Sequence, residues 1–165
     1  SNIVPERPDG KGGMAPCETW DNATLLCEAA GADGKSFPMT LKMQRIAPGE
    51  MNTWYIEIKG TQACARFSTK NPKRLELLEY AGGEQSWRQI DVGYEPAFKA
   101  ITGGIFEFGF PDAVQQMWAG FLDEMHHGRA RNRFAACVRP EETALSHRLF
   151  TAALESQRRQ STVTL

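Results

Sequence analysis

Residues 54–80 read WYIEIKGTQACARFSTKNPKRLELLEY, and this stretch decides the fold class. Trp54, Ile56 and Ile58 alternate with more polar neighbours, which is the period of a half-buried β-strand. A glycine separates this run from a second alternating run, 63–67, and an Asn-Pro pair separates that run from a third. Glycine, asparagine and proline adopt the backbone angles that turns need. The stretch therefore predicts three short strands joined by turns.

Further strand candidates extend this pattern on both sides, at 19–27, 39–43 and 87–92. No helix of crossover length lies between the candidates, so the sequence predicts an antiparallel meander of six strands rather than a doubly wound parallel sheet. Neither G-x-G-x-x-G nor G-x-x-x-x-G-K-[ST] occurs in the sequence. The chain therefore carries no recognisable nucleotide-binding loop of its own.

Composition narrows the class of protein without indicating a chemistry. The chain has 165 residues, 19 basic and 20 acidic side chains, and 41% hydrophobic residues. These are ordinary values for a globular domain, and no window approaches the roughly 18 consecutive apolar residues of a membrane span. A net charge near zero gives no general attraction to nucleic acid or anionic lipid. Since no signal peptide is recognisable, we expect a cytoplasmic protein that binds neither nucleic acid nor membranes.

The cysteines give no sign of a metal site or of a disulfide framework. They are Cys17, Cys27, Cys64 and Cys137, and no two of them form a CxxC pair. A domain of this size does not need disulfides to fold, because its hydrophobic core is large enough. We therefore expect reduced, mostly buried thiols and no bound metal.

The sequence changes character after the last strand candidate. A glycine-rich and aromatic stretch, 94–110, has the length of a functional loop. Apolar residues then recur at helical spacing from Val114 to Met125, which predicts an amphipathic helix that ends at Gly128. Pro140, followed by two glutamates, opens a second helix with a face of small residues. Strands first and helices last indicate an α+β domain.

The first residues, 1–16, differ from the rest of the chain. Ser1-Asn2 resembles the scar that a tag-removing protease leaves, and the following residues mix prolines and glycines into a charged stretch. We interpret 1–16 as this scar and a loop from a truncated upstream region, and 17–165 as the domain proper. A natural flexible terminus is the alternative interpretation.

Few side chains suggest chemistry. His126 and His127 end the first predicted helix, but adjacent helical residues point about 100° apart and chelate one ion poorly. We expect both to be solvated, and His147 to be a surface or interface residue. A basic run comprises Arg129, Arg131, Arg133 and Arg139. The run lacks interleaved aromatic residues that could stack on bases, so it favours a solvated linker with ion pairs over a nucleic-acid contact.

Large aromatic residues and the number of strands point to a covered interface. The four tryptophans, three of them on strand candidates, favour a core or an interface over a platform for a sugar-like ligand. Two helices cannot cover both faces of a six-stranded sheet. We therefore expect an open face that carries Trp, Ile and Met side chains and is covered by another subunit or domain.

Several segments together resemble the C-terminal domain of the Gfo/Idh/MocA oxidoreductases. They are FSTKNPK at 67–73, QSW at 85–87, GGIFEFGF at 103–110, QMWAGFLDE at 116–124, PEET at 140–143 and SHRLFTAALES at 146–156. With Val163, the ending is similar to the closing helix and last strand of that family, and the resemblance extends from about residue 17 onward. It implies an α+β fold: an open-faced, mostly antiparallel sheet with helices packed on one face, of the GAPDH-like C-terminal domain type, with the Rossmann domain absent.

The resemblance also implies a function for the full-length protein. Members of this family bind NAD or NADP in an N-terminal Rossmann domain and transfer hydride to or from a sugar, a polyol or a similar hydroxyl compound. The family's Glu-Lys-Pro motif does not occur here, and its Asp and His pair would precede this chain. No catalytic or cofactor-binding residue is carried over. The resemblance implies a fragment that is inactive alone, with the Rossmann domain in cis and a homo-oligomer formed through the open sheet face.

For the substrate site we select Arg45, Lys70 and Tyr94 as polar candidates, and we expect the loop 94–110 to line the pocket. For each candidate the alternative is a surface charge or a packing tyrosine. A stand-alone binding or scaffold module of the same fold, without redox activity, is the alternative function. A nucleic-acid binder is a third.

Overall fold

The structure is a computed structural model that describes residues 1–92, 95–132 and 137–165. In chain order the elements are β1 Glu6–Pro8, β2 Met14–Pro16, β3 Asn22–Ala30, β4 Ser36–Gln44, β5 Tyr55–Lys59, β6 Ala63–Ser68, β7 Arg74–Glu79, β8 Arg88–Asp91, α1 Phe110–His127 and α2 Pro140–Arg159. Within the described residues all strand pairs are antiparallel, which confirms the α+β class without a parallel doubly wound sheet. Contacts group the chain into two units, 1–51 with 150–165, and 52–149.

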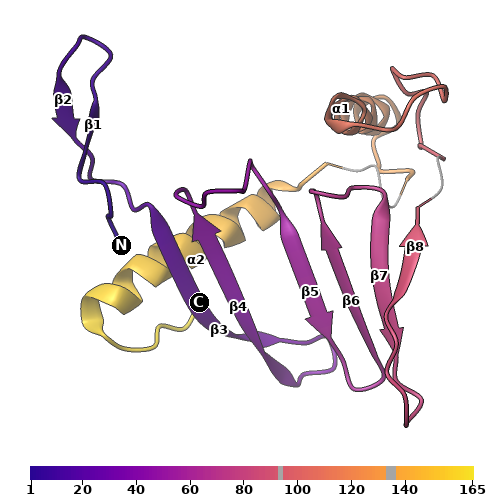
Figure 1. The fold of residues 1–165 in the computed structure, drawn as a ribbon, viewed down its shortest axis with the longest axis horizontal. Helices are drawn as coiled ribbons and strands as arrows, with labels where there is room; N and C mark the ends of the chain where they lie inside the picture. The colour runs from indigo at the N-terminus through magenta and orange to yellow at the C-terminus, as the bar shows by residue number, and fades with distance from the viewer. Residues whose placement is uncertain (93–94, 133–136) are drawn as a thin grey trace. The chain divides into compact units, whose positions relative to one another are not determined.

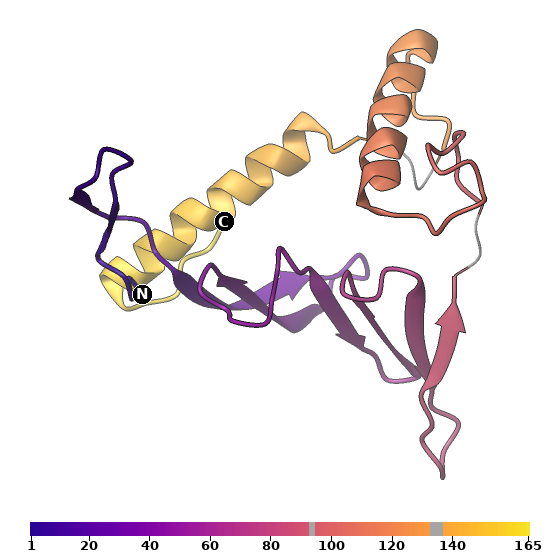
Figure 2. The same cartoon turned by 45° about the horizontal axis from the view of Figure 1, so that its top comes forward.

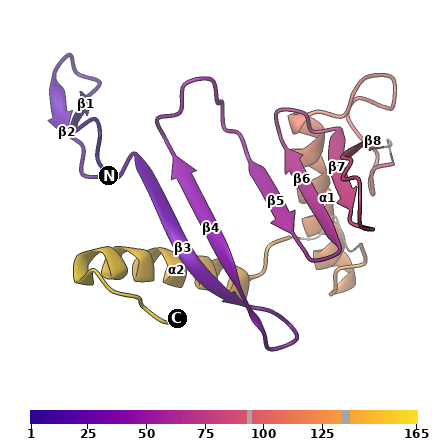
Figure 3. The ribbon, with the colours of Figure 1, turned by 60° about the horizontal axis from the view of Figure 1, so that its bottom comes forward.

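The first unit contains a long hairpin of β3 and β4 (Figure 3). Its turn includes Asp33-Gly34, as predicted, and Gly34 has a φ of +78°, which glycine adopts without steric cost. Along β3 the half-buried and exposed residues alternate from Ala23 onward. The strand begins at Asn22 and not at residue 19, and the backbone N–H of the preceding Asp21 donates to the Ser1 carbonyl at 2.9 Å.

Residues 6–16 form a small hairpin where the sequence suggested a loop. β1 and β2 pair from Glu6–Pro16 to Pro8–Met14. The carboxylate of Asp9 accepts hydrogen bonds from the backbone N–H groups of Lys11 and Gly13, at 2.7 and 2.9 Å. The glycines that indicated a loop therefore lie in the turn between β1 and β2, and the Asp9 side chain stabilises this turn.

The second unit contains the four strands predicted from the 54–92 region. β5, β6, β7 and β8 lie side by side in chain order (Figure 1). The register aligns an apolar row on one face, consisting of Ile56, Phe67, Leu75 and Ile90. It aligns a polar row on the opposite face, consisting of Glu57, Arg66, Glu76 and Gln89. The alternation that predicted the strands thus separates an apolar face from a charged one.

The expected single six-stranded meander is wrong in one respect. The structure divides these strands into a two-stranded and a four-stranded sheet. The segment between β4 and β5 contains Pro48-Gly49, and Gly49 has a φ of +89°. The exposed apolar side chains predicted for the sheet are present, because Trp54, Ile56 and Ile58 are 72%, 54% and 59% exposed.

Helix α1 has the ends that the sequence predicted. Pro111 lies in its first turn, where a missing N–H costs nothing. At the other end Gly128 takes the left-handed conformation, with φ 70° and ψ 7°, which terminates the helix. The loop before α1 contacts this helix (Figure 2).

Helix α2 begins at Pro140, as predicted, and ends at Arg159. The strand expected around Val163 is wrong, since residues 162–165 have no regular secondary structure. The chain instead turns back on the helix end, where the Ser161 N–H donates to the Ser156 carbonyl at 3.2 Å and the Ser156 hydroxyl donates to the Ser161 carbonyl at 2.7 Å. Among the described residues, neither helix is long and apolar enough to cross a membrane.

Candidate functional site

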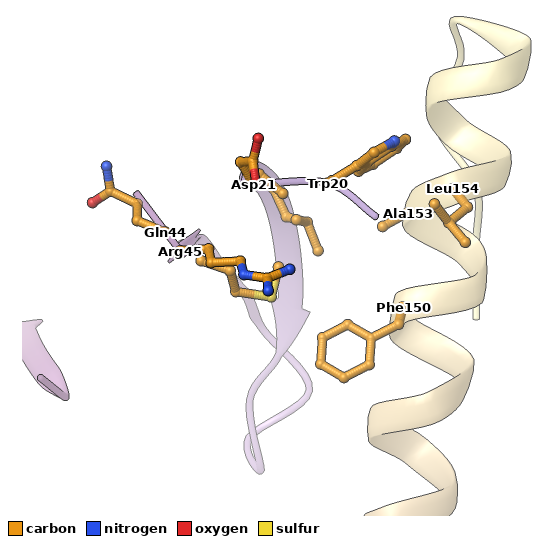
Figure 4. A pocket seen from close by; sticks show the side chains of 10 residues that line it. Trp20, Asp21, Gln44, Arg45, Phe150, Ala153 and Leu154 are labelled. Carbon is orange, nitrogen blue, oxygen red and sulfur yellow. The ribbon is translucent and has the colours of Figure 1, made fainter. Parts of the chain in front are cut away.

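A cavity of the first unit lies between the β3–β4 hairpin and the second half of α2 (Figure 4). Its volume is about 430 Å³. The lining residues are Trp20, Asp21, Ala23, Leu25, Met43, Gln44, Arg45, Phe150, Ala153 and Leu154. Seven of these ten side chains are apolar. The volume falls in the range of small-molecule sites, which are mostly apolar with a few polar groups.

Asp21, which precedes β3, is the buried carboxylate of this unit. Its residue is 2% exposed. One carboxylate oxygen accepts the backbone N–H groups of Ile3 and Val4, at 2.7 and 2.8 Å, and the other accepts from the Arg7 guanidinium. The hydrogen bond from Val4, the largest cause, holds the pKa of Asp21 below its ordinary value. An ionised and fully bonded carboxylate positions the chain and is not suited to proton transfer.

Arg45, one of the predicted substrate contacts, lies at this cavity. Its backbone N–H donates to the Asp21 carbonyl at 2.6 Å, and its guanidinium donates to the Thr19 hydroxyl at 3.3 Å. In Figure 4 its side chain extends from the end of β4 toward α2, whereas Gln44 points away from the helix. Among the described residues, no carboxylate forms an ion pair with Arg45.

Of the other two predicted substrate contacts, the structure describes Lys70 only. Lys70 is exposed in the turn between β6 and β7, where its backbone N–H donates to the Ser68 hydroxyl at 3.2 Å. It belongs to the second unit, and Arg45 to the first. Tyr94 lies outside the described residues.

A smaller polar depression of about 180 Å³ lies on the charged face of the β5–β8 sheet. Its centre is the pair of Arg66 and Glu76, which face each other on neighbouring strands and form two hydrogen bonds of 2.6 and 3.1 Å. These bonds are the main cause of a lowered pKa of Glu76. The guanidinium carbon of Arg66 is 4.3 Å from the centre of the Trp87 ring, within cation–π distance. Arg74, which also lines the depression, pairs with Asp91 at 3.3 Å, so both of its arginines are engaged by carboxylates.

The loop before α1 is fixed by two side chains of that helix. Asp112, 1% exposed, accepts from the Gly109 backbone at 3.0 Å and from Thr102, and the Gly109 bond is the main cause of its lowered pKa. The Gln116 side chain accepts the Phe98 N–H at 2.9 Å and donates to the Phe98 carbonyl at 2.8 Å. The loop predicted to be functional is thus held in a defined conformation over its described part.

The histidines and the described arginines of the basic run lie on the surface, as the sequence predicted. His126, His127 and His147 are exposed, and the described residues include no group of three side chains that could hold a metal ion. Of the three arginines of the run that the structure describes, two form ion pairs: Arg131 with Asp123, and Arg139 with Glu124 at 3.2 Å. This confirms local ion pairs in the linker, although Arg133 lies outside the described residues.

Tryptophans and cysteines are less buried than expected. Trp20, Trp54 and Trp118 are 38%, 72% and 58% exposed, so they are not core residues, and an interface role for them stays a prediction. The cysteines are free, as expected, but all four are half-buried. Cys17 is the distinctive one, because hydrogen bonds from Thr19 and then Arg7 lower the pKa of its thiol.

Sequence reasoning did not single out Asp21, Arg66 or Asp112. A signal existed for Asp21, since it is an acidic residue that shares the alternating apolar face of Ala23 and Leu25. No comparable signal marked Asp112, because an acidic residue in the first turn of a helix is usually exposed to solvent.

The fold is similar to that of solved oxidoreductases. An oxidoreductase domain protein from Kribbella flavida matches with a TM-score of 0.72 and 19% identity, over 97% of this chain and 41% of that chain. Levoglucosan dehydrogenase matches in a complex with NADH and L-sorbose, with a TM-score of 0.71, and in a complex with NADH, with 0.73. Each of these two matches has 19% identity and covers 98% of this chain and 41% of the other. No protein-family model and no curated protein matches the chain.

This chain has the fold of one part of these oxidoreductases. The match is consistent with their C-terminal domain, and it confirms the fold that the Gfo/Idh/MocA resemblance implied. The chain spans 41% of the length of the matched structures. A dinucleotide site of the usual kind needs a parallel βαβ unit with a glycine-rich turn. The described strands pair only in antiparallel fashion, so these residues do not fit NAD or NADP, and no step of hydride transfer can be assigned to them.

Proposed function

We propose that this chain is the substrate-binding and oligomerisation part of an NAD(P)-dependent oxidoreductase that acts on a sugar, a polyol or a similar hydroxyl compound. One observation carries the proposal: 97–98% of the chain matches part of oxidoreductases, and levoglucosan dehydrogenase is among them. Hydride transfer requires the nicotinamide and the substrate carbon in contact. A Rossmann domain outside this chain would hold NAD or NADP, and this chain would hold the substrate. The location of the whole protein would be the cytoplasm.

Arg45, Lys70 and Tyr94 remain the proposed polar contacts to the substrate. Arg45 has the best structural support of the three, because it lies at a cavity and no carboxylate neutralises it among the described residues. A guanidinium can donate two parallel hydrogen bonds to vicinal oxygens.

The proposed partner is a second copy of this chain, seated on the apolar face of the β5–β8 sheet. Ile56 and Ile58 on this face are more than half exposed, and exposed apolar patches mark interaction sites. Glu57, between them, points to the opposite face and is a matched control. Light scattering at micromolar concentration should show an oligomer that Ile58→Lys dissociates and Glu57→Lys does not. A monomeric wild-type chain, or dissociation by Glu57→Lys alone, would contradict this interface.

The natural reading frame tests whether a separate domain binds the cofactor while this chain binds the substrate. The proposal expects about 120 or more further residues upstream that contain a glycine-rich strand-turn-helix, which is the size of a dinucleotide-binding unit. A natural protein that starts near residue 1 and binds no nicotinamide would instead establish the stand-alone binding module.

A further inference from the structure

The cavity between the β3–β4 hairpin and α2 has a chemistry that a sugar site would not need. Trp20, Met43, Phe150 and Leu154 line it, and each is more than a third exposed. A polyol hydroxyl that left water for such a wall would lose hydrogen bonds without replacement. The lining favours a compact apolar body instead.

Two charged side chains, Asp21 and Arg45, line the cavity, and only Arg45 lacks an ion-pair partner among the described residues. The Asp21 carboxylate also lines it, but Arg7 and two backbone N–H groups already engage both of its oxygens. Glu155, on the same helix segment as Phe150, forms ion pairs with Arg158 and Arg159. Of the described charged residues at the cavity, Arg45 alone is left with donors to spare, since its guanidinium has one hydrogen bond, to Thr19.

Arg45 is placed so that it could bind the anionic group of a ligand whose apolar part fills the cavity. The backbone hydrogen bond to Asp21 fixes the end of β4, and the side chain extends from there toward α2 (Figure 4). Trp20 and Phe150, from the segment before β3 and from α2, line the same cavity with aromatic rings. A planar apolar body could lie against these rings while its charged end reaches the guanidinium.

We propose that this cavity binds a small monocarboxylate with an aromatic or branched aliphatic body, whose carboxylate Arg45 holds. At this cavity Arg45 would then hold the carboxylate in place of the sugar or polyol contact proposed above, and the rest of the proposed function does not depend on this site. It would make the hairpin and α2 a second ligand site of the protein.

Phenylacetate and its neutral analogue phenylacetamide test this assignment on the 165-residue chain. The readout is the indole N–H signal of Trp20 in a two-dimensional NMR titration, assigned with Trp20→Phe. We expect phenylacetate to shift this signal and to bind at least about tenfold more tightly than phenylacetamide, because a charge-assisted bond to arginine is lost in the amide. Arg45→Gln should abolish the preference, and Arg45→Lys should keep part of it.

Controls separate this site from general effects. Arg88→Gln, an exposed arginine of the other unit, should leave both affinities unchanged. Sorbitol should not shift the Trp20 signal. A sorbitol shift of Trp20 that Arg45→Gln removes would support the sugar contact of Arg45 and overturn this proposal, whereas binding of sorbitol elsewhere would leave it standing, so the two proposals fail by different results. Equal affinity for the acid and the amide, a preference that survives Arg45→Gln, or no shift of Trp20 with phenylacetate would each overturn the proposal.

Discussion

The carboxylate of Asp112 accepts two hydrogen bonds from Thr102, one from the backbone N–H at 3.1 Å and one from the hydroxyl at 3.2 Å. Thr102 lies in the loop before α1 and Asp112 in the first turn of α1, so this contact ties the loop to the helix. An asparagine has one acceptor oxygen and would present its NH₂ group to a donor. We expect Asp112→Asn to lower the melting temperature by about 5 °C or more. Asp33→Asn, in an exposed turn that suits Asn-Gly equally, should leave it unchanged.

The same carboxylate makes stability depend on pH. Because the pKa of Asp112 is lowered in the folded chain, its contribution is complete above the ordinary aspartate pKa, about 3.9, and is lost as the pH falls through the folded value. The difference in unfolding free energy between wild type and Asp112→Asn should therefore be constant near neutral pH and shrink below about pH 4. A difference that grows on acidification would contradict an ionised Asp112.

Leu78 tests where the core of the second unit lies. It is 7% exposed, and truncation of a buried leucine leaves a cavity. We expect Leu78→Ala to reduce the free energy of unfolding in denaturant by about 2–4 kcal/mol. Leu26→Ala removes the same atoms from a side chain that is 85% exposed, and it should cost less than about 0.5 kcal/mol. Similar costs for the two variants would show that the burial pattern is wrong.

Gly128 tests the end of α1. Its φ of 70° is unfavourable for a residue with a Cβ, although asparagine tolerates it better than alanine. We expect Gly128→Ala to destabilise the chain by about 1 kcal/mol and Gly128→Asn to cost less, both measured by thermal unfolding. Equal stability of the alanine variant would indicate that the helix does not end in this conformation.

Alternation and turn residues were sufficient to predict the strands and helices, but not the contacts between them. The run around Ile56 predicted β5, and Pro140 predicted the first residue of α2. Local periodicity could not show that Asp21 would be buried by Ile3, Val4 and Arg7, because those partners are 14 or more residues away. It also could not show that the strands divide into two sheets, since pairing depends on contacts outside each strand. Arg45 was selected from the sequence for its polarity alone, and nothing in the sequence indicated that it would line a cavity.

Cys17 should be the most reactive of the four half-buried thiols. Hydrogen bonds from Thr19 and Arg7 lower the pKa of its thiol, which raises the thiolate fraction at neutral pH. We expect alkylation by iodoacetamide at pH 7 to be severalfold faster at Cys17 than at Cys64, followed by peptide mass spectrometry. Thr19→Val removes the largest cause and should slow Cys17 without changing Cys64. Equal rates at both cysteines would contradict this environment.

The most direct measurement follows nicotinamide absorbance at 340 nm, the usual wavelength for the reduced cofactor, with the complete natural protein and with this chain alone. Both are given NAD or NADP and a panel of sugars and polyols. We expect the complete protein to reduce the nicotinamide with at least one hydroxyl compound, and the 165-residue chain to leave it oxidised. Turnover by this chain alone, or a complete protein that neither binds nor reduces a nicotinamide, would contradict the account.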